Sequence, residues 1–392
     1  MNTHSLVLPD LLGTFALVLV SSCAAAEQSP PVDSNALVLD ELVTDAERLG
    51  WSSAGLTTIR QEVVSLGAAA VLIVTSGEVV LRHGDVAKNY RAHSIRKSFL
   101  SALYGIAIER GRIDPTQTLG ELGIDEKTPL TESEKRATIT DLLASRSGVY
   151  LPAASEVAAA RDGRPERHEY EPGSHWYYNN WDFNVLGSIY RQETGEDIFE
   201  AFERQLAIPI GMQDFELKGT RYQFEDVSLH PSYKFRMSTR DLARFGILFL
   251  NRGRWGGVSI VPEEWVATST RVHSVTGRRG TKSGYGLMWW VSTEEQARSI
   301  GSGGPAPYTA SGTGGHRLTV LPDIDTVLVF RVDTDSPGAA RIGSSAYDRF
   351  VESVLRARLS RDEGSGPSNR MKQSDGSSGG RWLETPFVRH AD

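Results

Sequence analysis

The stretch "HSIRKSFLSALYGIAIERGRID", residues 93–114, holds a serine and a lysine three positions apart at the start of an apolar-periodic segment. Apolar residues recur at helical spacing from Leu100 to Ala107, which predicts a helix. On a helix this spacing puts Ser94 and Lys97 on one face. A serine hydroxyl attacks a carbonyl only when a neighbour takes its proton, and a buried lysine can do so. The pair therefore fits either a nucleophile with its proton acceptor or a capping serine beside a solvated lysine.

The composition restricts the class of partner. The chain has 392 residues, of which 40% are hydrophobic and 23% charged, an ordinary globular mixture. Its net charge of -7 argues against a nucleic-acid partner, and no glycine-rich phosphate loop follows a predicted strand. The four residues His168, Glu169, Glu171 and His175 match no zinc pattern. We therefore predict no metal, no cofactor and no nucleic acid.

The two ends of the chain read as segments outside the folded domain. Residues 1–26 contain the apolar run "LLGTFALVLVSSCAAAEQ", typical of an export signal, although the first ten residues have no Lys or Arg. Two processing routes stay open: "VSSC" resembles a lipobox with Cys23 lipidated and membrane-anchored, and "AAA" before Glu27 fits a signal-peptidase site. Either way we expect an exported bacterial protein, periplasmic or anchored to a membrane. Residues 27–38 read as a linker and residues 361–392 as a disordered tail.

Strand patterns lie at both ends of the predicted domain, residues 39–360. "AAVLIVTSGEVVLRHG" reads as two strands joined at Ser76–Gly77, and "YGLMWWV", "PYTASG", "HRLTVLP" and "DTVLVFRVDT" read as late strands. Helical patterns fill the middle, among them "STRDLARFGILFLNRG", which Gly253 closes. A last amphipathic helix, "SSAYDRFVESVLRARL", ends the domain. This order predicts an α+β fold: one antiparallel sheet from both chain ends, flanked by helices, with a mostly helical inserted subdomain.

Five stretches stand in the order found in one known family: the opening stretch, "ITDLLASRSGV", "YYNNWDFNVLGSIYRQETGEDIFEAF", "MSTRDLARFGILFLNRGRWGG" and "SGTGGHRLTVLPD". Through them the chain resembles the serine β-lactamase and penicillin-binding-protein-like hydrolases over residues 45–358. It is most similar to the class C-like branch, which includes esterases, D-amino-acid peptidases and nylon-oligomer hydrolases. The resemblance implies a serine β-lactamase-like fold, with Ser94 acylated and Lys97 as its proton acceptor.

The family's second motif is Tyr-x-Asn, and "GSHWYYNNWDF", residues 173–183, offers it in two frames. The family pattern continues with an aromatic residue three positions after the Asn and then Leu-Gly. Phe183 and the Leu-Gly pair at 186–187 fit this continuation only if the motif is Tyr178 and Asn180. The resemblance implies that Tyr178 moves a proton between Ser94, Lys97 and the leaving group, and which of Lys97 and Tyr178 is the base stays open. Asn180 would bind the substrate or hold Lys97.

The neighbouring pair, Tyr177 and Asn179, is expected to be structural. Tyr177 fits a packing aromatic or a pocket wall, and Asn179 fits a turn or a helix cap.

The third motif is Lys or His, then Ser or Thr, then Gly. Here the frame gives Ala310-Ser311-Gly312, so the cation is missing. That cation binds a substrate carboxylate in members that recognise β-lactams, and its loss argues for esters or neutral amides. His316 and Arg317 follow, and we expect them to be ordinary strand or surface residues.

The resemblance implies that the backbone N–H groups of Ser94 and Thr313 bind the oxyanion. Trp289 and Trp290 fit either an acyl pocket or the core.

These features together predict a serine hydrolase that cleaves a small-molecule ester or amide through an acyl-enzyme on Ser94. An amidase acting on β-lactams or D-amino-acid peptides is the alternative within the family. A binding or sensing relative without turnover is the alternative outside enzymes. Residue patterns decide neither the substrate nor the oligomeric state.

Overall fold

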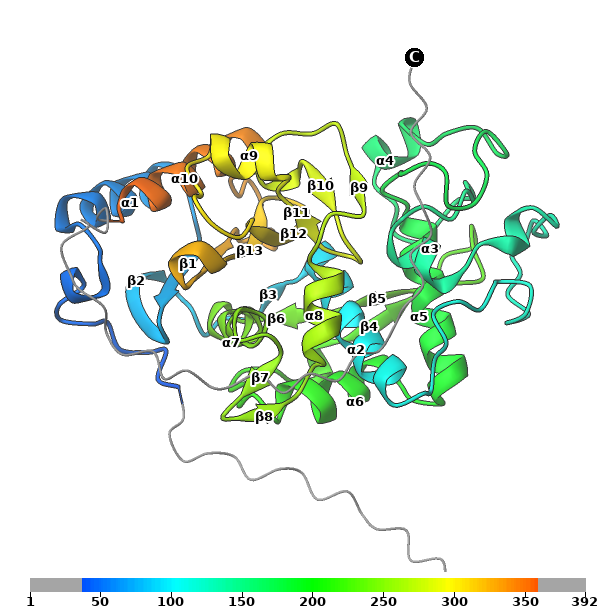
Figure 1. The fold of residues 1–392 in the computed structure, drawn as a ribbon, viewed down its shortest axis with the longest axis horizontal. Helices are drawn as coiled ribbons and strands as arrows, with labels where there is room; N and C mark the ends of the chain where they lie inside the picture. The colour runs from blue at the N-terminus through cyan, green and yellow to red at the C-terminus, as the bar shows by residue number, and fades with distance from the viewer. Residues whose placement is uncertain (1–36, 359–392) are drawn as a thin grey trace, which may run out of the picture.

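The computed structural model describes residues 37–358, and an eight-stranded antiparallel sheet forms its centre (Figure 1). The order across the sheet is β2-β1-β14-β13-β12-β11-β10-β9, so strands from both chain ends lie side by side. The strands are β1 (Ala70–Thr75), β2 (Glu78–Gly84), β9 (Ser274–Val275), β10 (Gly284–Tyr285), β11 (Trp290–Val291), β12 (Tyr308–Gly312), β13 (His316–Leu321) and β14 (Thr326–Arg331).

Strand β1 shows why the sheet has two apolar faces. Its six residues are all buried, and they alternate between two hydrophobic clusters: Val71 and Ile73 join one, Leu72 and Val74 the other. A strand buried on both faces reads as a continuous apolar run, as this one does. The hairpin to β2 turns at Ser76 and Gly77, whose φ angles of 51° and 82° are the left-handed values that tight hairpin turns need.

Two long helices cover one face of the sheet. They are α1 (Ser53–Ser65) and α10 (Ser344–Arg356), which pack against each other and close the cluster that contains Val71 and Phe330 (Figure 1). Both carry apolar residues at helical spacing, so each presents one buried face to the sheet.

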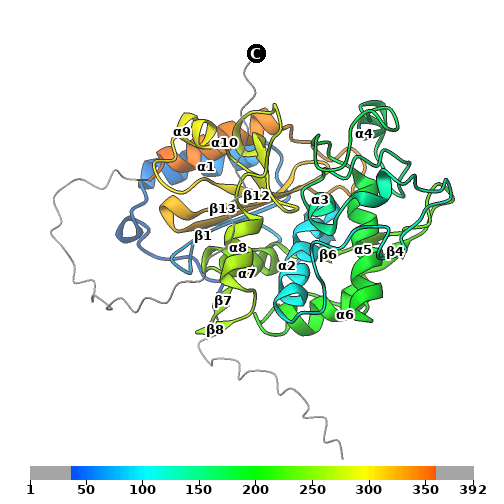
Figure 2. The same ribbon diagram turned by 45° about the vertical axis from the view of Figure 1, so that its right-hand side comes forward.

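The other face carries α7 (Thr239–Leu250), which contacts β1, β13 and β14, and beyond it the helical insert. Figure 2 shows α2 (Arg96–Glu109), α5 (Asn180–Thr194) and α6 (Ile198–Phe202) gathered on the side of the molecule away from α1 and α10. Helix α2 is buried along nearly its whole length, and its Phe99 contacts the rings of Phe202, Phe235 and Phe245. This central position explains why α2 is buried on all its sides and not on one face only.

The remaining helices are α3 (Ile139–Leu143), α4 (Ala158–Asp162), α8 (Glu263–Ser269) and α9 (Glu294–Ser299). Three short strand pairs accompany them: β3 (Tyr90–Arg91) with β6 (Arg236–Met237), β4 (Arg221–Gln223) with β5 (Ser232–Lys234), and β7 (Arg254–Trp255) with β8 (Val258–Ser259).

The predicted architecture is confirmed, and one local prediction is wrong. "YGLMWWV" is two short strands, β10 and β11, because Met288 turns the chain between them with a φ of 62°. Helix α7 ends at Leu250 with Asn251 as its C-cap, and Gly253 closes the turn that follows with a φ of 80°.

Three sequence predictions lie wholly or mostly outside residues 37–358: the signal over 1–26 with Cys23, the linker over 27–38 and the tail over 361–392. They stay predictions. The domain predicted over 39–360 is described as far as residue 358. Between residues 37 and 358, none of the helices has both the length and the apolar character needed to span a bilayer.

Candidate active site

The N-terminus of α2 brings the serine and the lysine of the opening stretch together. Ser94 lies in the short 3-10 helix η2 (His93–Ile95), which runs directly into α2. The Lys97 Nζ donates a hydrogen bond to the Ser94 Oγ at 2.8 Å. Only 2% of Lys97 is exposed, so the alternative of a capping serine beside a solvated lysine does not hold.

Burial decides the charge of Lys97. It lowers the pKa of this amine well below its usual 10.5, and the charges of Arg96 and Lys234 lower it further. Both neighbouring cations disfavour a third positive charge, as like charges do in a poorly solvated site. Burial and these two charges therefore favour the neutral form of the Lys97 amine.

Helix α5 supplies the other wall of the site. Asn180, the first residue of α5, accepts a second hydrogen bond from the Lys97 Nζ at 3.3 Å through its Oδ1. The rings of Tyr178 and Phe183 lie beneath the same amine, with centroids 4.9 and 4.7 Å from Nζ. Burial raises the pKa of Tyr178, and a hydrogen bond with Ser94 offsets part of that rise. Of the two roles open to Asn180, holding Lys97 is the one that a contact here supports.

Tyr177 and Asn179 point elsewhere. The Tyr177 hydroxyl donates to the carbonyl oxygen of Ala160, and the Tyr177 ring packs edge-on against Tyr150. Asn179 is the N-cap of α5: its Oδ1 accepts from the Trp181 N–H at 3.2 Å. Its amide group also donates to Asp182 Oδ1 at 2.8 Å. The alternation follows from the extended backbone before α5, in which successive side chains point to opposite sides.

Strand β12 forms the sheet side of the site, and Ser311 and Gly312 are its last residues. A Cβ on Gly312 would lie 2.8 Å from the carbonyl oxygen of Ala92 and 3.2 Å from the His93 Cβ, so only glycine fits this close approach. Ala310 faces the main core and is 1% exposed, so the motif position lacks both a cation and room for one. Thr313 follows directly at the turn to β13.

A buried polar network lies behind this strand. The Thr334 hydroxyl bridges two histidines, 2.8 Å from His93 Nε2 and 3.3 Å from His316 Nε2. Arg331 Nε donates to His316 Nδ1 at 3.0 Å. His316 and Arg317 lie in strand β13, as expected, but both are buried rather than on the surface. Through Thr334, His316 ties β13 to His93, directly before Ser94.

The network keeps both histidines neutral. Burial, with the charges of Arg91 and Arg331, lowers the pKa of His93 to about 4. Burial and Arg331 also lower the pKa of His316. His93 adopts a left-handed φ of 49°, which is costly for a residue other than glycine. The contacts around His93 hold this conformation directly before Ser94.

Sequence reasoning missed the further cations around Ser94. Arg96 stacks on the Tyr233 ring at 4.8 Å, and burial together with Arg96 lowers the pKa of Lys234 to about 7. Lys282 and Arg278 lie over the ring of Trp290. No spacing or motif marks these residues, because they come from separate elements that meet only in the folded chain.

Trp289, directly before β11, and Trp290, its first residue, have different surroundings, one in the core and one at the site. Trp289 is fully buried and packs between Phe245 and Phe249. Trp290 stacks on Tyr178, with ring centroids 5.2 Å apart and planes 21° apart. Trp289 therefore belongs to the core, and Trp290 to the site.

The loop with His168, Glu169, Glu171 and His175 contains an aromatic contact instead of a cluster of metal ligands. His175 stacks on Tyr170 with ring centroids 3.8 Å apart. Over the described stretch, 37–358, no group of three or more His, Cys, Asp or Glu side chains is placed to hold a metal ion.

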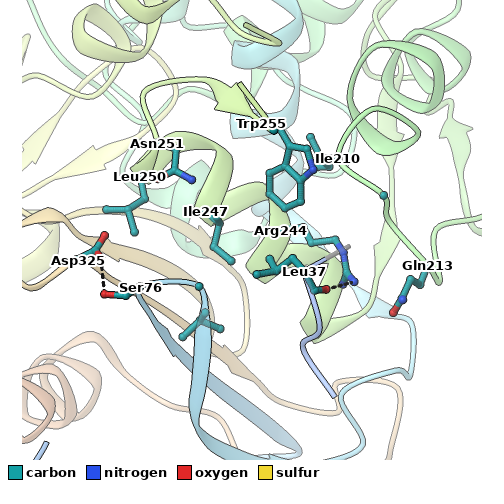
Figure 3. Close-up of a pocket in the computed structure, with 14 residues that line it drawn as sticks. Leu37, Ser76, Ile210, Gln213, Arg244, Ile247, Leu250, Asn251, Trp255 and Asp325 are labelled. Carbon is teal, nitrogen blue, oxygen red and sulfur yellow. Dashed lines mark hydrogen bonds between the residues drawn. The ribbon is translucent and has the colours of Figure 1, made fainter. Parts of the chain in front are cut away.

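A separate cavity of about 460 Å³ lies between the β1–β2 turn, α7 and the β7–β8 hairpin (Figure 3). Leu37, Ile247 and Trp255 give it apolar walls, and Arg244 Nη2 closes one side by donating to the Leu37 carbonyl oxygen at 3.1 Å. Its lining includes none of the residues around Ser94. It is therefore not part of the candidate active site.

An antiparallel sheet built from both chain ends, with a helical insert that carries a Ser-x-x-Lys pair, defines a beta-lactamase-like fold. The comparison with protein families agrees: the family model described as Beta-lactamase matches residues 57–351. The chain belongs to this family, whose members are serine hydrolases, including esterases and amidases.

One curated relative and several solved structures are similar. An uncharacterized protein of Alkalihalophilus pseudofirmus is 23% identical over 304 residues, which cover 68% of this chain and 84% of the relative. A family VIII carboxylesterase superposes with a TM-score of 0.56 at 14% identity, covering 79% of this chain and 99% of that one. A penicillin-binding protein homolog from Caulobacter crescentus gives a TM-score of 0.55 at 14% identity with the same coverage.

A candidate 6-aminohexanoate-dimer hydrolase from Bacillus anthracis gives a TM-score of 0.55 at 19% identity, covering 76% of this chain and 81% of that one. At such identities the likeness establishes the fold. The names of these proteins differ in the bond that each would cleave, so they assign no substrate to this chain.

Proposed function

We propose that the protein is a serine hydrolase that cleaves an ester or amide bond through an acyl-enzyme on Ser94. The observation that carries the proposal is the 2.8 Å contact between Lys97 Nζ and Ser94 Oγ, made by an amine whose pKa burial lowers. A neutral amine at this distance can take the proton of the serine hydroxyl as the oxygen attacks a carbonyl.

The first half-reaction forms a bond between Ser94 Oγ and the carbonyl carbon while Lys97 takes the hydroxyl proton. The negative charge on the carbonyl oxygen is bound by the backbone N–H groups of Ser94 and Thr313, the first of which also lies in the field of the α2 N-terminus. Collapse of the intermediate breaks the bond to the leaving group. The proton passes from Lys97 to that group, with Tyr178 as the relay.

The second half-reaction uses water. Lys97 or Tyr178 takes a proton from the water as it attacks the acyl carbon, and the proton returns to the Ser94 oxygen as the acid leaves. Asn180 supports both halves by accepting a hydrogen bond from Lys97, which keeps the amine aimed at Ser94. The rings of Phe183 and Tyr178 lie against the amine, where they would stabilise the ammonium that forms when Lys97 takes the proton.

Labelling with a fluorophosphonate probe tests the proposal, with peptide mass spectrometry to find the modified residue. We expect the wild type to be labelled on Ser94 and Ser94→Ala to be unlabelled. The matched control is Ser98→Ala, one turn further along α2, where the hydroxyl donates to the Met288 carbonyl oxygen. Labelling of Ser94→Ala at the rate of the wild type would overturn the proposal.

A further inference from the structure

Two cations share one indole ring beside the candidate active site. The Lys282 Nζ lies 4.9 Å from the centroid of the Trp290 ring, and the Arg278 guanidinium lies 5.3 Å from it. Lys282 ends the short 3-10 helix η6 (Gly280–Lys282), and Arg278 lies in the loop before it. Cations are attracted to the face of a tryptophan, which explains how like charges come this close.

Neither cation has a counter-ion among residues 37–358. Among the residues that the structure describes, the Lys282 Nζ and the Arg278 guanidinium have no hydrogen-bond or ion-pair partner. The carboxylate of Asp348 lies close enough to influence Lys282, yet its Oδ1 accepts the Thr281 hydroxyl at 2.8 Å and the Thr281 N–H at 3.2 Å. Lys282 is 9% exposed, and burial, with the charges of Arg317 and Arg278, lowers the pKa of its amine well below 10.5. A carboxylate bound beside this amine would favour its charged form.

The charge of Arg278 acts on one of the reacting groups, Tyr178. The indole ring of Trp290 contacts both cations, and the same ring stacks on the ring of Tyr178. The charges of Arg278 and Arg317 both favour the ionised form of Tyr178 and so oppose the rise of its pKa. Helix η6 itself packs against β11 and β12, the strands that carry Trp290 and Ser311. Trp290 thus links the two cations to Tyr178.

We propose that Lys282 and Arg278 form a subsite for a carboxylate on the substrate of the Ser94 reaction. The proposal deepens the serine hydrolase function above and rests on it. A carboxylate suits this place because a guanidinium and an ammonium give it charge-assisted hydrogen bonds, and Trp290 offers an apolar surface for the carbon chain that links it to the reacting carbonyl. The substrate class is then an ester or amide that carries a free carboxylate a few bonds from the cleaved bond.

The subsite changes the meaning of Ala310. The third motif is the one position at which sequence patterns place a cation for a substrate carboxylate. Its absence at Ala310 therefore argued for neutral substrates. In the folded chain the charge comes from a different element, helix η6 and the loop before it, and reaches the same edge of the site through Trp290. An alanine at residue 310 is therefore compatible with an anionic substrate.

Two matched pairs of esters test the subsite. In the first pair the acyl part varies: the 4-methylumbelliferyl monoester of adipic acid is compared with the same ester capped as its methyl ester. In the second pair the leaving group varies: the butyrate ester of 4-hydroxyphenylacetic acid is compared with that of its methyl ester. In one pair we expect the wild type to prefer the anionic member in kcat/KM by about 10- to 100-fold, mainly through KM.

Variants on the same short segment assign the preference. Lys282→Met keeps the volume and removes the charge, and Arg278→Gln does the same at an exposed position; each should reduce the preference to about 3-fold or less. Lys282→Arg should retain it. The matched control is Arg279→Gln, which changes the net charge equally on an exposed neighbour whose side chain has no partner within residues 37–358. Thermal melting shows whether the buried Lys282 variant is folded.

The outcomes separate the subsite from the chemistry. A preference lost in both Lys282→Met and Arg278→Gln, and kept in Arg279→Gln, supports the proposal. Equal rates within both pairs for a wild type that is labelled on Ser94 would overturn the subsite and leave the hydrolase standing. So would a preference that survives both substitutions. A wild type that neither cleaves any of the four esters nor labels on Ser94 would overturn the hydrolase, and the subsite with it.

Discussion

The two sides of Ser94 are built differently. On the helical side, formed by Tyr178 and Asn180, polar side chains themselves face the Ser94–Lys97 pair. On the sheet side, the His316 and Thr334 side chains bond to each other, and Gly312 brings its backbone close to Ala92 and His93, directly before Ser94.

This difference separates two kinds of sensitivity. Proton transfer needs side chains of the right type, so the helical side should respond to the loss of a single functional group. Oxyanion binding needs backbone N–H groups in the right place, so the sheet side should respond to changes in position. Substitutions that keep shape and remove one polar atom can tell the two apart.

The largest effect is expected on the helical side. Tyr178→Phe keeps the stacking on Trp290 and removes the hydroxyl that hydrogen-bonds with Ser94. We expect kcat/KM for an ester to fall by about 100- to 10,000-fold, the usual range for loss of a general acid or base. Initial-rate assays with a chromogenic ester measure this fall in kcat/KM directly.

Tyr177→Phe is the control, since it removes an identical hydroxyl one residue away. Its hydroxyl bonds to the Ala160 carbonyl oxygen, so the expected cost is about 1 kcal/mol of stability with kcat/KM within roughly 3-fold of wild type. If Tyr177→Phe were the more damaging of the two, the frame that selects Tyr178 and Asn180 would be wrong.

The second prediction concerns pH and belongs to the sheet side. His93 has a pKa of about 4 when folded, against an ordinary value of 6.5. Between these values the unfolded chain binds a proton that the folded chain does not, so stability rises with pH and is lost as the pH falls from 6.5 to 4. The shift corresponds to about 3 kcal/mol.

Urea unfolding at pH 7 and pH 4 measures the effect, with His93→Asn as the comparison. Asparagine does not titrate and tolerates the left-handed φ of 49°. The wild type should lose about 2 to 3 kcal/mol more than the variant over this interval. His316 titrates in the same direction in both proteins and so cancels in the difference. Equal losses in the two proteins would show that His93 is already solvated.

Much of this arrangement could be predicted from local patterns. The strand and helix periods gave the sheet from both chain ends, and the spacing of Ser94 and Lys97 placed them together because one helix carries both. The choice of Tyr178 over Tyr177 came from the family's Tyr-x-Asn pattern and the residues that follow it, and the buried face of α5 fits the same frame. These features depend on residues close together in the chain.

The cations and the histidine network could not be predicted in the same way. Lys282, Arg278 and Trp290 meet because a loop, a 3-10 helix and a strand pack together. Thr334, which lies 241 positions after His93, bonds to both His93 and His316. The split of "YGLMWWV" was missed for a similar reason: its apolar run fits one buried strand, and only the left-handed Met288 breaks it.

The smallest effect is expected at Thr334, and it decides whether the sheet side acts through position. Thr334→Val keeps the methyl group that packs against Gly314 and removes the hydroxyl between the two histidines. Without that bridge, the segment before Ser94 and the β12–β13 turn lose a shared contact, and the two oxyanion donors are less well fixed. We expect kcat to fall about 10-fold with KM unchanged, because a small misplacement of reacting groups weakens transition-state binding more than substrate binding.

Thr334→Ser retains the hydroxyl and should stay within roughly 3-fold of the wild type in kcat. A merely structural role would lower the melting temperature of Thr334→Val without changing kcat of the folded enzyme, so both are measured on the same samples. The rate of probe labelling at Ser94 should fall with kcat, since the same N–H groups bind the probe's phosphoryl oxygen. A fall in kcat that Thr334→Ser restores would make Thr334 a positioning residue, acting on Ser94 through His93 and on the oxyanion strand through His316.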